Sequence, residues 1–280
     1  MLEAIKNHWP EYLIEAWCLG TFMVSACFFG VALFYPTSPA AAFSDEVRNV
    51  LMGAAMGVTA VAIICSPWGK RSGAHFNPAV TLTFLRLRKI KAWDAGFYIG
   101  SQFVGGVAGV LFSWLVLGEL LSSSAVNFVV TAPGSYGVGA AFAGEAVIAF
   151  LMMTMILFTS DSPRLARLTP YLAGCLVAVY ISLESTVSGM SMNPARTFAS
   201  AAVAGKWTSW WIYFVAPPAA MLAAAELFVR KRGIKRVLCA KLHHFNSARC
   251  IFNCEFQKMH AAIIQATKES QSVPSGSGLF

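Results

Sequence analysis

The sequence predicts an all-α integral membrane protein in which six transmembrane helices and two re-entrant half-helices form an inverted repeat. Composition is the first observation behind this prediction. Hydrophobic residues make up 57% of the 280 residues and charged residues only 12%, whereas soluble domains carry about 25% charged residues. The second observation is that the tripeptide Asn-Pro-Ala occurs twice, at 77–79 and 193–195, within otherwise apolar sequence. The composition argues against a soluble protein, and the repeated tripeptide indicates an internal duplication.

Six apolar segments are each long enough to cross a bilayer, which takes about 20 residues. The polar, mixed-charge residues 1–10 lack the small-residue cleavage site of a signal peptide, so we expect the first segment to stay in the membrane. The predicted spans are residues 12–35, 47–66, 95–118, 137–159, 169–188 and 208–229.

Lys and Arg residues set the expected orientation, because basic loops remain on the cytoplasmic side. They gather after the second, fourth and sixth spans, whereas residues 119–136, after the third span, contain none. We therefore expect a multi-pass protein of the plasma membrane or the bacterial inner membrane, with both termini cytoplasmic. The net charge of +8 then belongs to flanks that face lipid headgroups, so no nucleic-acid partner is expected.

The pattern divides the chain into three parts. They are a cytoplasmic N-terminus at 1–10, a channel domain at 11–232 and a cytoplasmic tail at 233–280. Within the channel domain the two repeats cover about 11–118 and 137–232. Because each repeat holds an odd number of spans, the second is inverted relative to the first, as in many membrane transport folds.

Each tripeptide is typical of a helix start, since Asn is a favoured N-cap and Pro a favoured first helical residue. Asn77-Pro78-Ala79 and Asn193-Pro194-Ala195 would open short segments at 77–87 and 193–205. At about 1.5 Å per residue, such helices cross roughly half of a 30 Å hydrocarbon core. Entering from opposite faces, they would meet N-terminus to N-terminus near the midplane. Non-helical backbone at that depth must be buried in protein or line a water-filled path.

The expected meeting point favours neutral molecules. Each helix N-terminus carries about half a positive charge, and the Asn amides add N–H donors, so protons and cations would meet a barrier. Arg196 directly follows the second tripeptide, and a charged residue at membrane depth is usually functional. Its alternative role is to hold a loop through carbonyl or carboxylate groups. Since no nucleophile–base pair or phosphate-binding loop is evident, we expect no enzymatic activity.

These motifs resemble those of the aquaporin, or major intrinsic protein, family. The resemblance rests on residues 73–81 and 192–196, on Glu15 and Glu145 within spans, and on Gln102. It implies six tilted helices, one pore per subunit and a homotetramer, with water, small neutral solutes and membrane lipid as partners. Glu15, Glu145 and Gln102 are expected to support the loops that lead to the tripeptides.

The same resemblance, carried over by spacing from the tripeptides, places the narrowest constriction at Met56, Ile181, Met190 and Arg196. Strict water channels would have Phe, His and a small residue beside the Arg, so this lining is less polar and softer. Met56 and Ile181 have an alternative role as packing residues beside the pore. Thr197, where glycerol-conducting relatives usually carry Asp, favours water. We expect a passive water channel that also admits small uncharged solutes, with a wider facilitator for glycerol or similar solutes as the alternative.

His75 lies two residues before Asn77, near the predicted cytoplasmic mouth of the pore. As a pore-lining group it could change the flow when protonated. The alternative is that its ring fixes the loop through hydrogen bonds to backbone groups.

The tail at 233–280 lies outside the channel pattern and concentrates metal-binding residue types. Four Cys or His ligands suit tetrahedral zinc or an iron–sulfur cluster. One alternative is an amphipathic helical hairpin against the membrane, with the cysteines as small apolar residues, and another is thiol redox sensing. The channel itself is expected to require no cofactor. A channel regulated by a metal- or redox-sensing tail is a further alternative. The candidate ligands are Cys239, His243, His244, Cys250 and Cys254.

Overall fold

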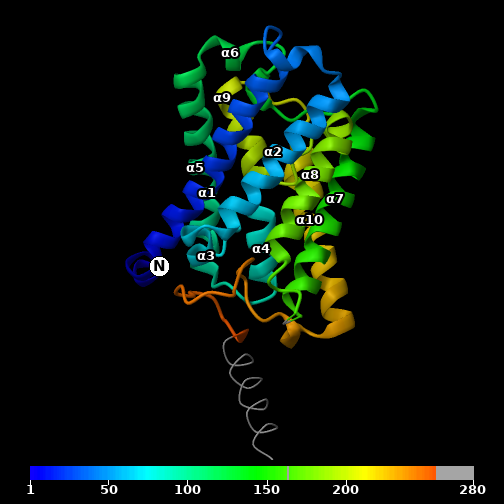
Figure 1. Cartoon of the computed structure of the whole chain (residues 1–280). Helices are drawn as coiled ribbons and strands as arrows, with labels where there is room; N and C mark the ends of the chain where they lie inside the picture. Colours follow the sequence, from blue (N-terminus) through cyan, green and yellow to red (C-terminus); the bar gives the residue numbers. More distant parts are fainter. Residues whose placement is uncertain (163, 257–280) are drawn as a thin grey trace, which may run out of the picture.

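Six long helices form the body of the protein, whose computed structural model describes residues 1–162 and 164–256 (Figure 1). All six are long and apolar enough to cross a membrane, which confirms the predicted spans, and no strand occurs in the described part of the chain. The helices are α1 (Leu2–Phe34), α2 (Asp45–Cys65), α5 (Ala92–Leu117), α7 (Gly137–Ser160), α8 (Thr169–Ser188) and α10 (Trp211–Arg232).

Helix α1 begins well before the predicted first span, so the segment expected at 1–10 is part of this helix. Its polar residues are held by contacts with distant parts of the chain. His8 Nδ1 lies 2.7 Å from Asp94 Oδ1, and the Tyr12 hydroxyl donates to the same oxygen at 2.6 Å. Glu11 is fully buried and pairs with Arg71 (Nε···Oε1 3.0 Å). Local composition could not reveal these partners, which lie far away in sequence.

Two shorter helices enter the bundle between the long ones. Helices α4 (Pro78–Arg86) and α9 (Pro194–Ala204) begin at the predicted Pro residues, with Asn77 and Asn193 as their N-caps. With nine and eleven residues, each reaches about halfway across a hydrocarbon core. The other short elements are α3 (Pro67–Ser72), α6 (Glu119–Ser122), η1 (Pro39–Ala42), η2 (Asn127–Val129) and η3 (Ile234–Arg236).

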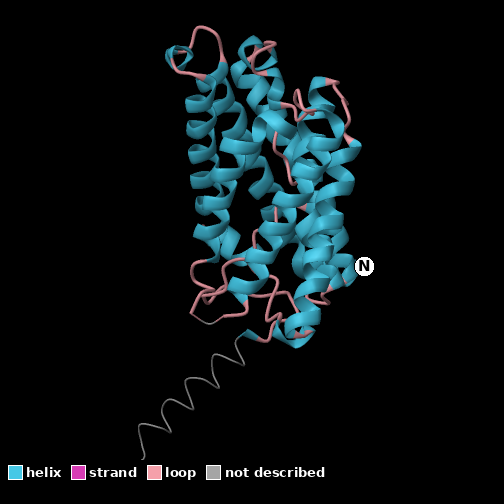
Figure 2. Ribbon diagram, turned by 90° about the vertical axis from the view of Figure 1, so that its right-hand side faces the viewer, coloured by secondary structure: helices cyan, strands magenta, loops and turns pink. Residues whose placement is uncertain are grey.

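Close helix crossings hold the bundle together both within and between the two repeats (Figure 2). Helix α1 packs along α5, α2 along α8, and α7 along α10. A Cβ added at Gly105 of α5 would collide with the backbone of Ala16 in α1, and one at Gly57 of α2 with the Gly174 carbonyl in α8. Small residues at such crossings let membrane helices approach closely. Gly57 and Gly105 therefore permit the tight packing around α4 and α9.

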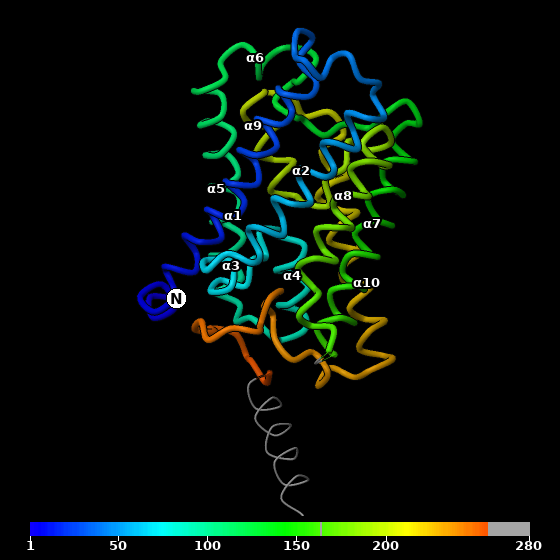
Figure 3. The backbone as a smooth tube through the Cα atoms, in the orientation of Figure 1, coloured from blue at the N-terminus to red at the C-terminus, as the bar shows by residue number. Residues whose placement is uncertain are grey.

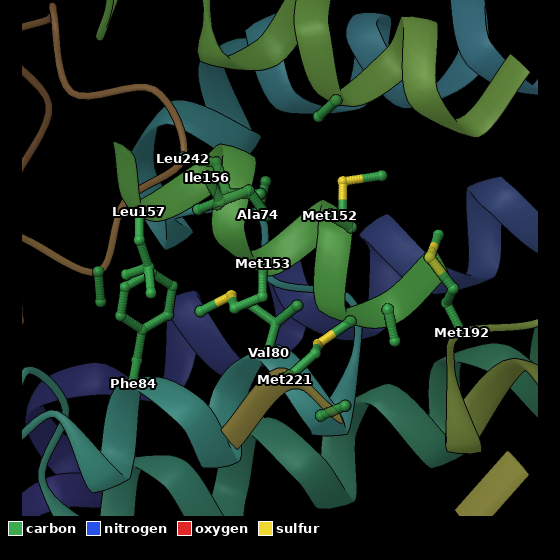
Figure 4. Packing of buried hydrophobic residues seen from close by; sticks show 14 of the residues in the cluster. Ala74, Val80, Phe84, Met152, Met153, Ile156, Leu157, Met192, Met221 and Leu242 are labelled. Atoms are coloured by element: carbon green, nitrogen blue, oxygen red, sulfur yellow. The ribbon is translucent and has the colours of Figure 1, made fainter. Parts of the chain in front are cut away.

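Buried apolar side chains surround the half-helix α4. Val80 and Phe84 of α4 belong to one cluster with Met153 of α7 and Met221 of α10 (Figure 4). Leu242, from the segment after α10, belongs to the same cluster. Methionine side chains adapt in shape and fill irregular space between crossing helices. The tail is therefore packed onto the core of the bundle.

The tail folds back under the end of the bundle that carries the chain's N-terminus, which we call the N-terminal end (Figures 1 and 3). The Leu242 N–H donates to the Gly73 carbonyl at 3.1 Å, and the Asn253 N–H to the Lys89 carbonyl at 2.9 Å. Residues 237–255 are irregular, so the helical hairpin considered for the tail is wrong for this segment. The physical reason is that these N–H groups bond to channel loops instead of closing helical turns. Residues 257–280 of the predicted tail lie outside the described residues.

Candidate functional site

The N-termini of α4 and α9 meet inside the bundle, where two hydrogen bonds join them. Asn77 Nδ2 donates to the carbonyl oxygen of Met192 (2.8 Å), and Asn193 Nδ2 donates to that of Phe76 (2.7 Å). Each Asn thus bonds to the residue that precedes the other Asn, and both Asn side chains are buried. The half-helices face each other end to end, as the inverted repeat predicts.

The same two amides also cap their own helices. Asn77 Oδ1 accepts a hydrogen bond from the Ala79 N–H at 2.8 Å, and Asn193 Oδ1 accepts one from the Ala195 N–H at 3.0 Å. Because an amide NH₂ group carries two hydrogens, the cross-link leaves one N–H of each Asn for a further acceptor. The meeting point therefore combines two spare donors with the positive ends of two helix dipoles.

A buried carboxylate holds the loop before α4. Glu15 Oε1 accepts from the Ser72 hydroxyl (2.8 Å) and from the His75 N–H (3.0 Å). Its Oε2 accepts from the Phe76 N–H (2.7 Å) and from the Gln102 amide (2.8 Å). Glu15 and Gln102, both expected to support this loop, therefore act together on the backbone that leads to the first tripeptide.

A second buried carboxylate holds the loop before α9 in the same way. Glu145 Oε1 accepts from the Ser188 hydroxyl and from the Ser191 N–H, both at 2.7 Å. Its Oε2 accepts from the Met192 N–H at 2.7 Å. Each glutamate thus satisfies two backbone N–H groups that no helix can use.

Two serine–tyrosine pairs complete these loops, and sequence reasoning did not assign them. The Tyr98 hydroxyl donates to the Ser72 carbonyl at 2.7 Å, and the Tyr213 hydroxyl donates to the Ser188 carbonyl at 2.5 Å. A signal for the serines was present in the sequence, because each lies five residues before its Asn (77 − 72 and 193 − 188). The tyrosines follow their serines by 26 and 25 residues (98 − 72 and 213 − 188), so their spacing repeats to within one residue, and they reach their partners across the bundle.

Both loops contain left-handed backbone at equivalent positions. Ala74 and Phe76 have φ of 52° and 31°, and Met190 and Met192 have φ of 42° and 53°. The two pairs are related by one offset, since 190 − 74 and 192 − 76 are both 116. Non-glycine residues in this region cost of order 1–3 kcal/mol each and cluster at functional sites. The strain is therefore part of the duplicated design.

A cavity of about 160 Å³ lies at the end of the bundle opposite the N-terminal end. The four residues expected to form the constriction all line it. Met56 is nearly inaccessible and contacts Ser25 (Oγ···Sδ 3.7 Å), so it also packs against α1. The lining residues used below are Met56, Ile181, Met190, Arg196, Val129 and Gly189.

Arg196 projects from the first turn of α9 into this cavity. Its Nη1 donates to the Val129 carbonyl at 2.7 Å, so the loop between α5 and α7 fixes the guanidinium. The next residue, Thr197, shares hydrogen bonds with the Ser191 hydroxyl (2.7 Å) and the Thr131 hydroxyl (2.8 Å). Arg196 thus both holds a loop and presents a positive charge to the cavity.

His75 lies beneath the tail and is only 1% exposed. Its Nδ1 is 3.1 Å from Thr81 Oγ1 and its Nε2 is 2.8 Å from the Ala240 carbonyl oxygen. The ring stacks between Phe84 and Phe252, with centroid distances of 5.2 and 5.4 Å. The structure therefore places His75 in a closed contact with the tail instead of at an open mouth.

Glu184 has no role in the sequence-based account, and the structure places it beside the second loop. Its Oε2 lies 2.6 Å from the Ser188 hydroxyl, which is also 2.7 Å from Glu145. A Cβ added at Gly144 of α7 would collide with Glu184 Oε1. Because Ser188 has one hydroxyl proton, one of these two contacts requires a proton on a carboxyl group. Glu184 thus faces α7 and the loop.

Four of the five candidate metal ligands in the tail converge. The ligand atoms of Cys239, His244, Cys250 and Cys254 all lie within 4.8 Å of one another. His243 is not part of this group, and its Nδ1 has no hydrogen-bond partner among the described residues. The prediction of His243 as a ligand is therefore wrong, because in this irregular segment only the ring of His244 reaches the three cysteines. Hydrogen bonds from Cys239 and Cys250 hold the pKa of the Cys254 thiol well below its usual range.

Comparison with known sequences gives consistent results. The family model described as Major intrinsic protein matches residues 5–227. Probable aquaporin NIP4-2 of Arabidopsis thaliana is 32% identical over 194 residues, which cover 65% of this chain and 66% of that protein. Aquaporin-4 of Bos taurus is 31% identical over 185 residues, which cover 65% of this chain and 56% of that protein. The chain thus spans less than two thirds of the length of these relatives.

Comparison with solved structures shows a shared fold. The X-ray structure of the aquaglyceroporin from Plasmodium falciparum superimposes with a TM-score of 0.65 and 17% sequence identity. The match covers 79% of this chain and 95% of that chain. At this identity the similarity shows the arrangement of helices and nothing about the solute.

Proposed function

The chain belongs to the major intrinsic protein family, whose members are channels and not enzymes, and on this premise we propose that it is a passive channel for water. The observation that carries the proposal is the meeting of α4 and α9 at Asn77 and Asn193. Each amide keeps one N–H for a passing molecule. A water that accepts from both has its oxygen occupied, so it cannot relay a proton along a hydrogen-bonded chain. The two helix dipoles add a positive barrier against cations.

Arg196 supplies the second part of the proposed mechanism. Its guanidinium is fixed by the Val129 carbonyl at the edge of the cavity. A fixed positive charge with several N–H donors repels cations and offers hydrogen bonds to neutral polar molecules. We assign selectivity to this end of the pathway, with Met56, Ile181 and Met190 as its apolar wall.

The apolar wall also supports a second candidate function. Methionine side chains are flexible, and two of the three apolar wall residues are Met56 and Met190. A lining of this kind can widen for glycerol or another small uncharged solute, so a wider facilitator is the alternative. Water is favoured because Thr197, bonded to Ser191 and Thr131, stands where glycerol-conducting relatives usually carry Asp.

The setting of the channel is part of the same proposal. The N-terminal end carries the basic loops and the tail, so we propose that it faces the cytoplasm. The membrane would be the plasma membrane or a bacterial inner membrane. The family also implies a homotetramer, which chemical cross-linking of the purified protein tests directly.

The function is tested by stopped-flow light scattering on proteoliposomes. Vesicles are exposed to an impermeant osmolyte or to glycerol, and the matched variant is Arg196→Ala with Arg164→Ala as the control. Fast shrinkage without reswelling in glycerol supports a water channel, and fast reswelling supports the wider facilitator. The variant Phe252→Ala, which loosens the tail over His75, is measured in parallel. If the wild type and Phe252→Ala both shrink no faster than empty liposomes, the proposal is rejected.

A further inference from the structure

The convergence of Cys239, His244, Cys250 and Cys254 is not explained by packing alone. His244 Nε2 lies 3.0 Å from Cys254 Sγ, and Cys239 Sγ lies 3.6 Å from Cys250 Sγ. Cys239 and His244 are buried, and the other two are half-buried. The four residues come from two stretches of an irregular segment, so no helix or strand forces their ligand atoms to meet.

The spacing of the four atoms fits one tetrahedral ion. With Zn–S bonds of about 2.3 Å and Zn–N bonds of about 2.0 Å, tetrahedral ligand atoms lie roughly 3.5–3.8 Å apart. The observed atoms all lie within 4.8 Å of one another, so small movements bring them onto one ion. An iron–sulfur cluster distributes its four ligands over two or four irons, which spreads the ligand atoms farther apart. The geometry therefore favours a single ion over a cluster.

The charge around the group also fits zinc. A divalent ion with three thiolates and a neutral imidazole has one negative charge in excess. Lys241 is buried, and burial lowers the pKa of its ammonium group, whereas the three cysteines favour the charged form. Its Nζ donates to the carbonyl oxygens of Ala248 and Arg249, at 3.1 and 2.7 Å. Lys241 would therefore neutralise the site and close the loop that carries its ligands.

The segment that carries the four ligands is attached to both ends of α4. Before α4, Leu242 bonds to the Gly73 carbonyl, and Phe252 stacks on His75. After α4, Asn253 bonds to the Lys89 carbonyl through its N–H and to the Arg88 carbonyl through its side chain. A bound ion would fix the fold of the segment and hence its position on the half-helix that begins at Asn77.

We propose that Cys239, His244, Cys250 and Cys254 bind one Zn²⁺ ion, which locks residues 237–256 onto the loops around α4. The ion is structural, since four protein ligands leave no open position for a reacting molecule. A reducing cytoplasm would keep the thiols available. The metal site stands on its own geometry and does not depend on which solute the channel carries.

The test begins with the zinc content of the full-length protein, purified under reducing conditions and measured by elemental mass spectrometry. We expect about one zinc per chain in the wild type and background levels in His244→Ala and Cys254→Ser. The matched controls are His243→Ala, which changes the adjacent histidine, and Cys175→Ser, which removes a cysteine exposed on α8. Both controls should keep the metal.

Cobalt supplies a second readout that a failure to fold cannot imitate. Metal-free protein titrated with Co²⁺ alone should develop the visible bands of tetrahedral cobalt with thiolate ligands, and added Zn²⁺ should remove them. Limited proteolysis of the same samples should cut residues 237–256 faster without metal than with Zn²⁺. Cys250→Ser should give neither the bands nor the protection, while gel filtration shows an intact membrane domain.

Three results would overturn the proposal. The first is that reduced wild-type protein takes up no zinc even when Zn²⁺ is added. The second is that the control His243→Ala loses as much metal as His244→Ala. The third is that peptide mapping finds a Cys239–Cys250 disulfide in protein isolated without added oxidant. None of these results bears on the channel proposal, whose permeability test is separate.

Discussion

The loop before α4 and the loop before α9 are built on the same hydrogen bonds but lead to different surroundings. In each, a buried glutamate accepts two backbone N–H groups and a serine hydroxyl, and a tyrosine hydroxyl bonds to that serine's carbonyl. Beyond these bonds, the first loop is covered by the tail through His75. The second opens onto a cavity beside Arg196. The hydrogen bonds that position the two half-helices are therefore duplicated, whereas the surroundings of the two loops differ.

The largest expected effect concerns the duplicated carboxylates. Glu15→Gln and Glu145→Gln keep the size of the side chain but turn an NH₂ group toward buried donors. We expect each to lower the free energy of unfolding by about 2–4 kcal/mol, and by similar amounts because the two loops are equivalent. Thermal unfolding of the detergent-solubilised protein measures this. The control is Glu226→Gln, because the side chain of Glu226 is 40% exposed and pairs with Arg86, and the expected loss is about 0–1 kcal/mol. If either variant unfolded with the free energy of the wild type, the two loops would not depend equally on their glutamates.

The next effect removes the difference between the two ends. Val80 occupies the position in α4 that Arg196 occupies in α9, since both lie three residues after their Asn. Arg196→Val should therefore make the ends alike and raise glycerol permeability about tenfold, which corresponds to roughly 1.4 kcal/mol. Reswelling of proteoliposomes in glycerol measures the change, with Arg164→Val as the control. Unchanged reswelling would show that the cavity does not select.

A smaller effect compares the two serines. Ser72→Ala and Ser188→Ala each remove a hydroxyl that bonds to a buried carboxylate, and we expect each to cost about 1–2 kcal/mol in unfolding free energy at most. Ser188 also contacts Glu184, so Ser188→Ala removes a hydrogen-bonding partner from both Glu145 and Glu184. Unfolding curves at matched protein concentration test the pair. If Ser72→Ala alone were destabilising, the second loop would not depend on its serine.

The smallest expected effect concerns the covering of the first loop. Phe252→Ala removes one of the two rings that stack on His75 while leaving the Leu242 and Asn253 hydrogen bonds. We expect water permeability to rise about twofold, which corresponds to roughly 0.4 kcal/mol. The control is Phe245→Leu in the same segment, a change that keeps an apolar side chain. A fall in permeability would show that the tail supports the loop instead of restricting it.

The parts of this fold that depend on local chemistry could be predicted from sequence. The length and start of α4 and α9 follow from Asn capping and from Pro at the first helical position, and the long helices follow from apolar length. The grouping of Met56, Ile181, Met190 and Arg196 around one cavity was reached through family spacing. No local property of the sequence predicts that these four residues lie around one cavity.

Contacts that depend on distant residues could not be predicted. The polar start of α1 looked like a separate segment because Asp94, the partner of His8, lies far along the chain. A helical hairpin was one alternative for the tail, yet the backbone of this segment bonds to the carbonyls of Gly73 and Lys89. His243 and His244 could not be distinguished from the sequence, and only the path of the folded chain shows that His244 alone reaches the cysteines.

The paired N-termini of α4 and α9 are proposed to pass water and to stop protons. The test measures water flux and proton flux on the same proteoliposomes, prepared once with the wild type and once with Phe252→Ala. Light scattering reports osmotic shrinkage, and a trapped pH dye reports proton influx, with potassium and valinomycin carrying the counter-charge. We expect shrinkage much faster than in empty liposomes, with proton influx no faster than in empty liposomes. Proton influx that rises in parallel with water flow would contradict it.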